Sequence, residues 1–235
     1  MSLRFFIGVF HLGAVCLLGW QVREKIPAPA KAVVALVWCS LLTDLACFFA
    51  YQEGLAFLPL QHLYTFAEFL LEAQFVSSVT SSPRLRTVMN ALVPAFFLAW
   101  LGFHAWKPAM MLGDEPLIIL SDITMNWCIA FVLVSQMQNV STELRARGNY
   151  SVTTLFRETL RQIWLSQLGK IFTGLFCYNF FGLLIFAYQL VVPDSDTRYA
   201  HSASPLIKNT CIFLAFLESL PWKTLWKQFL SRLLP

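Results

Sequence analysis

Six ionisable residues lie inside long apolar stretches of the sequence, where a charge is costly. They are Asp44, Glu68, Glu72, Asp122, Lys170 and Glu218. In the middle of a bilayer each costs roughly 2.5–3.5 kcal/mol unless it is paired, protonated or hydrated. Five acids face a single base, so some of the carboxyl groups must hold a proton, water or an external cation. Such groups are suited to binding a cation or relaying a proton.

Depth along the expected helices divides these residues into two layers. At a rise of about 1.5 Å per residue, Asp44, Glu68 and Asp122 lie about 8–12 Å below the outer surface. The layer nearer the middle or inner half comprises Glu72, Lys170 and Glu218. We expect the first layer to form the mouth of an outward-opening acidic cavity. The second layer would form its base and act as a proton or cation relay.

One polar stripe runs along the stretch 60–80, because Gln61, Thr65, Glu68 and Glu72 recur at helical spacing. Such a stripe is expected to face the interior of a helix bundle. A purely structural interpretation is that the acids only hold helices together, but interhelical polar bonds in membranes average about 0.6 kcal/mol, little compensation for a buried charge. The expected cavity lining comprises Asp44, Glu68, Glu72, Asp122, Asn126, Lys170, Asn179 and Glu218.

The composition that must position these residues is that of a membrane protein. Hydrophobic residues make up 57% of the 235 residues and charged residues only 13%. The mean hydropathy is +0.62, whereas a soluble domain carries about 25% charged residues. We therefore expect an integral, multi-pass protein whose main surroundings are the lipid bilayer.

Seven apolar stretches approach the length of about 20 residues that a helix needs to cross a bilayer. They fall at about 3–22, 31–51, 60–80, 88–106, 117–138, 163–191 and 206–226. The sequence predicts an all-α fold, a single domain of seven transmembrane helices over residues 1–235. We expect the segment 139–162 to form an amphipathic surface helix continuous with the sixth stretch.

Basic residues predict the orientation, because short loops rich in Lys and Arg stay in the cytoplasm. One set of alternate loops and termini holds 12 basic residues, and the other holds Arg4, Lys107, Arg198 and Lys208. This bias predicts an N-terminus outside and a C-terminus in the cytoplasm. The basic residues form no continuous stripe, so the net charge of +4 predicts no nucleic-acid partner.

The six cysteines and four histidines are dispersed along the chain, and no two cysteines make a CxxC pair. Zinc sites and disulfide frameworks need closer spacing than this. We expect no metal site and no cofactor.

A resemblance to a known family rests on a few residues. The third stretch contains the segment YTFAEF, Trp164 begins the sixth, Asn179 lies deep within it, and Asn209 opens the seventh. The residues of YTFAEF that carry the resemblance are Tyr64, Thr65, Glu68 and Phe69. In this order they resemble a family of small, uncharacterised bacterial seven-span membrane proteins. The resemblance implies the bacterial inner (plasma) membrane and brings no activity.

Three functions remain open on these residues. The first is binding or transport of a small hydrophobic or cationic ligand through the acidic cavity. The second is acid catalysis on a lipid or prenylated substrate, with Glu72 or Glu218 as general acid, chemistry similar to that of fungal membrane-bound terpene cyclases. The tryptophan-glutamate pair of those enzymes is absent here. The third is a structural subunit of a membrane complex.

Glu72 and Glu218 are the residues that best separate these functions. Two carboxylates at similar depth in a low dielectric cannot both ionise cheaply. We expect the two to face one cavity, at least one of them to be protonated at neutral pH, and Lys170 to be the base nearest to them.

The basic bias makes a topology prediction. A reporter enzyme fused after Pro235 should be active only in the cytoplasm, and one inserted beside Asp194 only outside, because the loops richest in Lys and Arg are retained. Reporter activity on each side of the membrane measures this. An external C-terminus would mean that one span has been miscounted.

Overall fold

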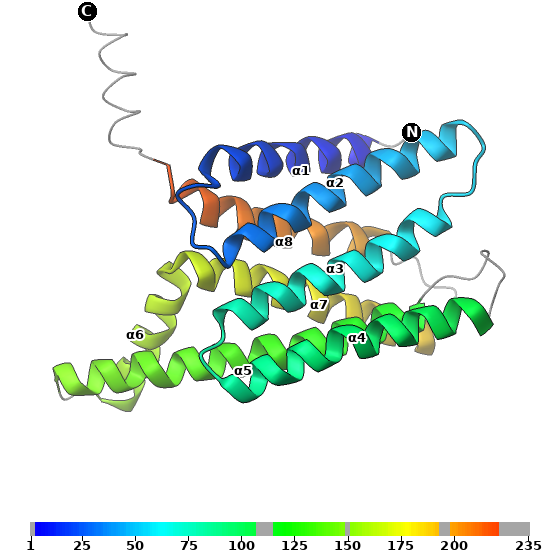
Figure 1. The fold of residues 1–235 in the computed structure, drawn as a ribbon. Coiled ribbons are helices and arrows are strands. Elements are labelled where there is room, and N and C mark those ends of the chain that lie inside the picture. Colours follow the sequence, from blue (N-terminus) through cyan, green and yellow to red (C-terminus); the bar gives the residue numbers. More distant parts are fainter. Residues whose placement is uncertain (1–2, 107–114, 149–150, 193–197, 221–235) are drawn as a thin grey trace, which may run out of the picture.

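The computed structural model describes residues 3–106, 115–148, 151–192 and 198–220, and these form an all-α structure (Figure 1). Within these ranges there are eight helices. They are α1 (Leu3–Val22), α2 (Ala30–Gln52), α3 (Leu58–Val79), α4 (Pro83–Trp106), α5 (Glu115–Arg147), α6 (Val152–Leu165), α7 (Gln167–Val191) and α8 (Arg198–Leu217).

Four of these helices are long and apolar enough to cross a membrane. The qualifying segments are Ala30–Gln52, Pro83–Phe103, Leu117–Ala146 and Gln167–Tyr188. Large apolar side chains also cover the outside of the bundle, where Phe10 is 81% exposed and Trp127 is 75% exposed. Such a surface is unfavourable in water and suits lipid. Length, composition and surface together indicate a helical membrane protein.

Six helices close a ring around a common interior. α1 packs against α2, α2 against α3, α3 against α5, α5 against α7, α7 against α8, and α8 against α1. α4 lies outside this ring against α3, and α6 lies beside α5 and α7 (Figure 1). The ring therefore places polar faces of α3, α5, α7 and α8 toward one another.

Several helix boundaries differ from the predicted stretches, because segments with prolines or charged residues are helical in the structure. α4 begins at Pro83, which suits the first turn of a helix because its missing N–H needs no partner there. α5 runs on to Arg147, beyond the predicted end at 138. α8 begins at Arg198, contains Pro205, which the sequence predicts to lie in a loop, and ends at Leu217, before the predicted end at 226.

The predicted continuity between the amphipathic helix and the sixth span is wrong. The amphipathic helix is present as α6, but Ser166 has an extended backbone (φ −75°, ψ 144°) that separates it from α7. The Ser166 hydroxyl accepts a hydrogen bond from the Gly169 N–H at 2.9 Å, which caps the first turn of α7. A serine N-cap thus ends one helix and begins the next.

Gly169 is required at this corner, and its substitution tests the packing. A Cβ at this position would lie 1.9 Å from the Ile163 carbonyl oxygen, a backbone atom that cannot rotate away. We expect Gly169→Ala to lower stability by about 1–3 kcal/mol or more, as overpacking does. Thermal unfolding in detergent, followed by circular dichroism, measures the change.

The matched control for this substitution is Gly102→Ala in α4. A Cβ at Gly102 meets no atom within 4 Å, and alanine favours a helix by up to about 1 kcal/mol over glycine. Equal behaviour of the two variants would show that the corner between α6 and α7 is not tightly packed.

Candidate functional site

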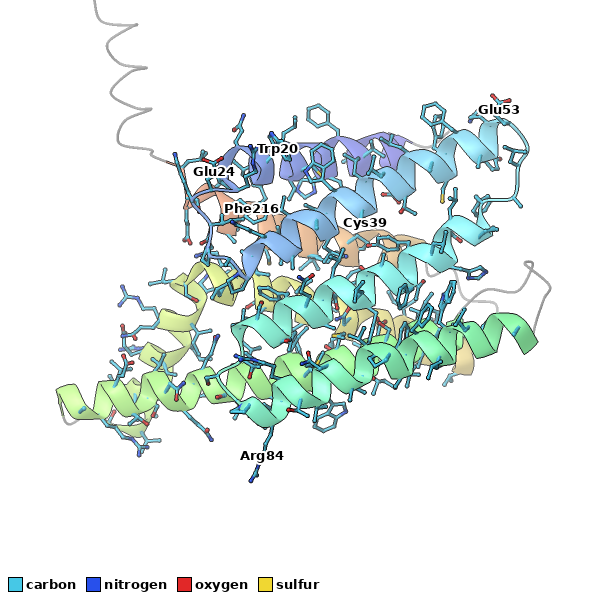
Figure 2. The ribbon with its side chains drawn as sticks, in the orientation of Figure 1. Trp20, Glu24, Cys39, Glu53, Arg84 and Phe216 are labelled. Atoms are coloured by element: carbon cyan, nitrogen blue, oxygen red, sulfur yellow. The ribbon has the colours of Figure 1, made fainter. Side chains whose placement is uncertain are left out.

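A cavity of about 660 Å³ lies between α2, α3, α5 and α7 and contains three acidic side chains. The cavity is lined in part by Tyr51, Gln52 and Phe57, which flank the loop that contains Glu53. The cavity therefore opens at this end of the bundle. Figure 2 shows Glu53 at this end and Glu24 at the opposite end. The lining residues are Thr43, Asp44, Cys47, Phe48, Tyr51, Gln52, Phe57, Gln61, Tyr64, Thr65, Glu68, Ile118, Ser121, Asp122 and Tyr178.

Glu68 is the centre of a buried polar network in the cavity wall. Its Oε1 accepts hydrogen bonds from Lys208 Nζ at 2.8 Å and from the Tyr64 hydroxyl at 2.8 Å. Its Oε2 accepts a longer bond from the Tyr178 hydroxyl at 3.4 Å. The Lys208 ammonium also lies 3.6 Å from the centroid of the Tyr178 ring. The carboxylate is therefore neutralised and held by groups from α3, α7 and α8.

Lys208 lies beside the cavity, although its sequence position predicts a place near the end of the seventh span. A last stretch that begins at 206 predicts that Lys208 lies close to a loop, whereas α8 begins at Arg198. Lys208 therefore lies in the middle of the helix, with a side chain only 3% exposed. Had Pro205 been accepted inside a helix, the inward-facing row Lys208, Ile212 and Ala215 would have indicated a buried ammonium.

Asp122 and Asp44 line the cavity from α5 and α2. Asp122 is 8% exposed and lies against the α7 backbone, where a Cβ on Gly182 would come within 2.6 Å of its Oδ2. Asp44 is exposed. Among the described residues neither carboxyl group makes a hydrogen bond or an ion pair. The structure thus brings together the three acids that were expected at the mouth.

Glu72 lies deeper than the cavity and does not line it. It is 2% exposed, and its Oε2 accepts a hydrogen bond from Asn179 Nδ2 at 3.0 Å. Its Oε1 is buried and has no partner. Asn179 and Glu72 therefore meet as a buried pair between α7 and α3.

Glu218 belongs to a different contact at the end of α8. It forms an ion pair with Lys170, and its own side chain is 42% exposed. Nearby, Gln167 Nε2 donates to the Ala215 carbonyl at 2.8 Å and to the Ser219 hydroxyl at 2.7 Å. The expectation that Glu72 and Glu218 share one cavity with Lys170 as common base is not met. Lys170 pairs with Glu218, and neither glutamate lines the acidic cavity.

Asn126 also lies apart from the cavity, although it follows Asp122 by one helical turn. It lines a shallow groove of about 250 Å³ between α5 and α7, together with Trp127 and Phe176. Both polar atoms of its amide are buried without a partner. Within the described ranges, no three His, Cys, Asp or Glu side chains are grouped so that they could hold a metal ion.

A cavity lined by three carboxyl groups, with one ammonium group behind its wall, lies inside an all-α bundle of the membrane-protein class. Comparison with known proteins gives no match to a family, to a curated protein or to a solved structure.

The ion pair between Glu68 and Lys208 makes a stability prediction. Removing one partner leaves the other charge buried and unpaired, so Glu68→Gln and Lys208→Met should each lower stability by about 3–5 kcal/mol. The double variant should recover most of this loss, because it leaves neither Glu68 nor Lys208 as an unpaired charge. Thermal unfolding of the four proteins in detergent measures the coupling.

Glu53→Gln is the control, because Glu53 is exposed and forms no ion pair with the described residues. If the Glu68→Gln and Lys208→Met proteins are as stable as the Glu53→Gln protein, Glu68 and Lys208 do not form a buried ion pair.

Proposed function

We propose that α1 to α5, α7 and α8 cross the membrane and that α6 lies at its surface. These helices run alternately toward one end of the bundle and the other (Figure 1). α3 is not among the four clear candidates. It carries Glu72, which is buried, and Glu68, which lines the cavity. α1 and α8 each have 20 residues, which is about 30 Å of helix.

The charge distribution supports a cavity that opens away from the cytoplasm. Most of the described basic residues lie at the ends of helices opposite the loop with Glu53, in the segments 23–31, 84–86, 145–148 and 151–161. Short basic segments stay in the cytoplasm. In this orientation the acidic cavity faces outward, as the depth of Asp44, Glu68 and Asp122 predicts.

The function that this arrangement supports best is binding of a small cationic ligand from the outside, as the first step of its transport across the membrane. One observation carries the proposal: three carboxylates line one cavity, and the single described base beside them, Lys208, neutralises only one. Acidic clefts with low-dielectric walls concentrate cations. Asp44 and Asp122 remain to attract one.

Acid catalysis on a lipid has less support, because it needs Glu72 or Glu218 to meet a substrate. Glu72 is enclosed below the cavity, and Glu218 is paired with Lys170 at the far end of α8. No contact of the described residues favours an assembly role. Of the three functions, cation binding therefore has the most support from the structure.

Cys47, which lines the cavity, allows a direct test of its charge preference. A cationic, membrane-impermeant thiosulfonate, 2-trimethylammonioethyl methanethiosulfonate, should modify Cys47 on intact cells about tenfold faster than the anionic sulfonatoethyl reagent, since an acidic cleft concentrates cations. Asp44→Asn and Asp122→Asn should each reduce this ratio.

Two further variants complete the measurement. Cys47→Ser subtracts modification of the other cysteines, and Glu53→Gln removes an acid at the same end that does not line the cavity. Equal rates for the two reagents, or a ratio that falls equally in the Glu53→Gln protein, would overturn the proposed function.

A further inference from the structure

The chemistry of the cavity walls narrows the cationic ligand to one class. Resting on the proposed cation binding, we infer that the ligand is a small organic ammonium, with its charged group against Asp122 and its hydrocarbon body against the aromatic side chains of the cavity. Neither the three acids nor the composition of the chain alone would require this.

The size of the cavity fits an organic molecule. Its volume of about 660 Å³ lies within the range of about 300–1,000 Å³ that is usual for small-molecule sites, and far exceeds what an inorganic ion fills. A bare metal ion needs several converging ligands, and the described His, Cys, Asp and Glu side chains form no such group. The cavity is therefore larger than an inorganic cation needs and has room for an organic molecule.

Aromatic rings supply the rest of the surface. Phe48, Tyr51, Phe57, Tyr64 and Tyr178 line the cavity together with the carboxylates. An ammonium group is attracted by the face of an aromatic ring, and its alkyl or aryl body gains from leaving water against the same rings. A hydrated inorganic ion gains little from such walls.

The chain already holds one ammonium group in this way. Lys208 Nζ lies 2.8 Å from a Glu68 oxygen and 3.6 Å from the centroid of the Tyr178 ring. Glu68 and Tyr178 both line the cavity, so this internal ammonium lies directly behind its wall. In this protein a carboxylate (Glu68) and the face of a tyrosine ring (Tyr178) together bind the Lys208 ammonium group.

The three acids have different roles in binding. Glu68 is occupied by Lys208. Asp122 is more than nine-tenths buried, lines the cavity and has no hydrogen-bond partner among the described residues, so its carboxyl group is free to pair with a cationic ligand with little competing water. Asp44 is exposed and attracts cations toward the mouth. Asp122 is therefore the residue that anchors the ammonium.

The test compares an ammonium with a neutral molecule of the same shape. Calorimetric titration of the detergent-purified full chain with 2-phenylethylammonium and with 2-phenylethanol isolates the charge. We expect the ammonium to bind at least about tenfold more tightly, as pairing with a buried carboxylate provides. Sodium chloride and magnesium chloride are titrated separately. Neither cation should bind through Asp122 or displace the bound 2-phenylethylammonium.

Variants locate the charge that is responsible. Asp122→Asn should abolish the difference between the two probes, whereas Asp44→Asn should change the Kd about threefold or less at about 0.15 M salt, because exposed charges act mainly on association rates. Glu53→Gln, outside the cavity, should leave both affinities unchanged. Comparing the two probes on the unaltered protein keeps the test decisive if a variant does not fold.

The possible failures are distinguishable. If Cys47 prefers the cationic reagent but 2-phenylethylammonium binds no better than 2-phenylethanol, or if sodium or magnesium binds in an Asp122-dependent way, the organic ammonium is wrong and cation binding stands. If Cys47 shows no charge preference and no cation binds, both inferences fall.

Discussion

The ion pair between Glu68 and Lys208 is the interaction on which the interior of this bundle depends. Two opposite charges removed from water are tolerated only when they meet and their remaining hydrogen-bonding capacity is satisfied. Here α3 and α8 belong to opposite arcs of the helix ring, so their contact fixes the distance across it. Tyr64 and Tyr178 complete the carboxylate's partners and extend the constraint to α7.

The same pair determines which charges the cavity presents. Because Lys208 lies behind the wall and neutralises Glu68, the cavity is neither a nest of three equal carboxylates nor a neutral space. Its character comes from Asp122, which is enclosed, and from Asp44, which is in contact with solvent. Burial therefore distinguishes acids that look equivalent in the sequence. Glu72, one turn deeper on α3, is bound instead to Asn179.

The sequence predicts the all-α class and the grouping of Asp44, Glu68 and Asp122 well, and the charge pairs less well. Hydropathy and spacing depend on local composition, so α1, α2 and α3 lie within two residues of the predicted stretches. The pairing of a base with an acid depends on where each helix ends and on the order of helices in the ring. Neither can be inferred from neighbouring residues in the sequence. With Pro205 assigned to a loop, the sequence does not predict that Lys208 lies in the interior. Similar depth predicts one site for Glu72 and Glu218, but they lie in separate contacts.

The length of α5 connects the cavity mechanically to the other side of the bundle. A single uninterrupted helix carries Asp122 at one end and Arg145 at the other, 23 residues apart, which is roughly 35 Å of rigid rod. α6 packs against the distal part of this rod. A change in tilt of α5 by a few degrees when Asp122 is occupied would swing its far end by an ångström or more. Through α5, a change at the cavity would therefore reach the opposite end of the bundle, where α6 packs.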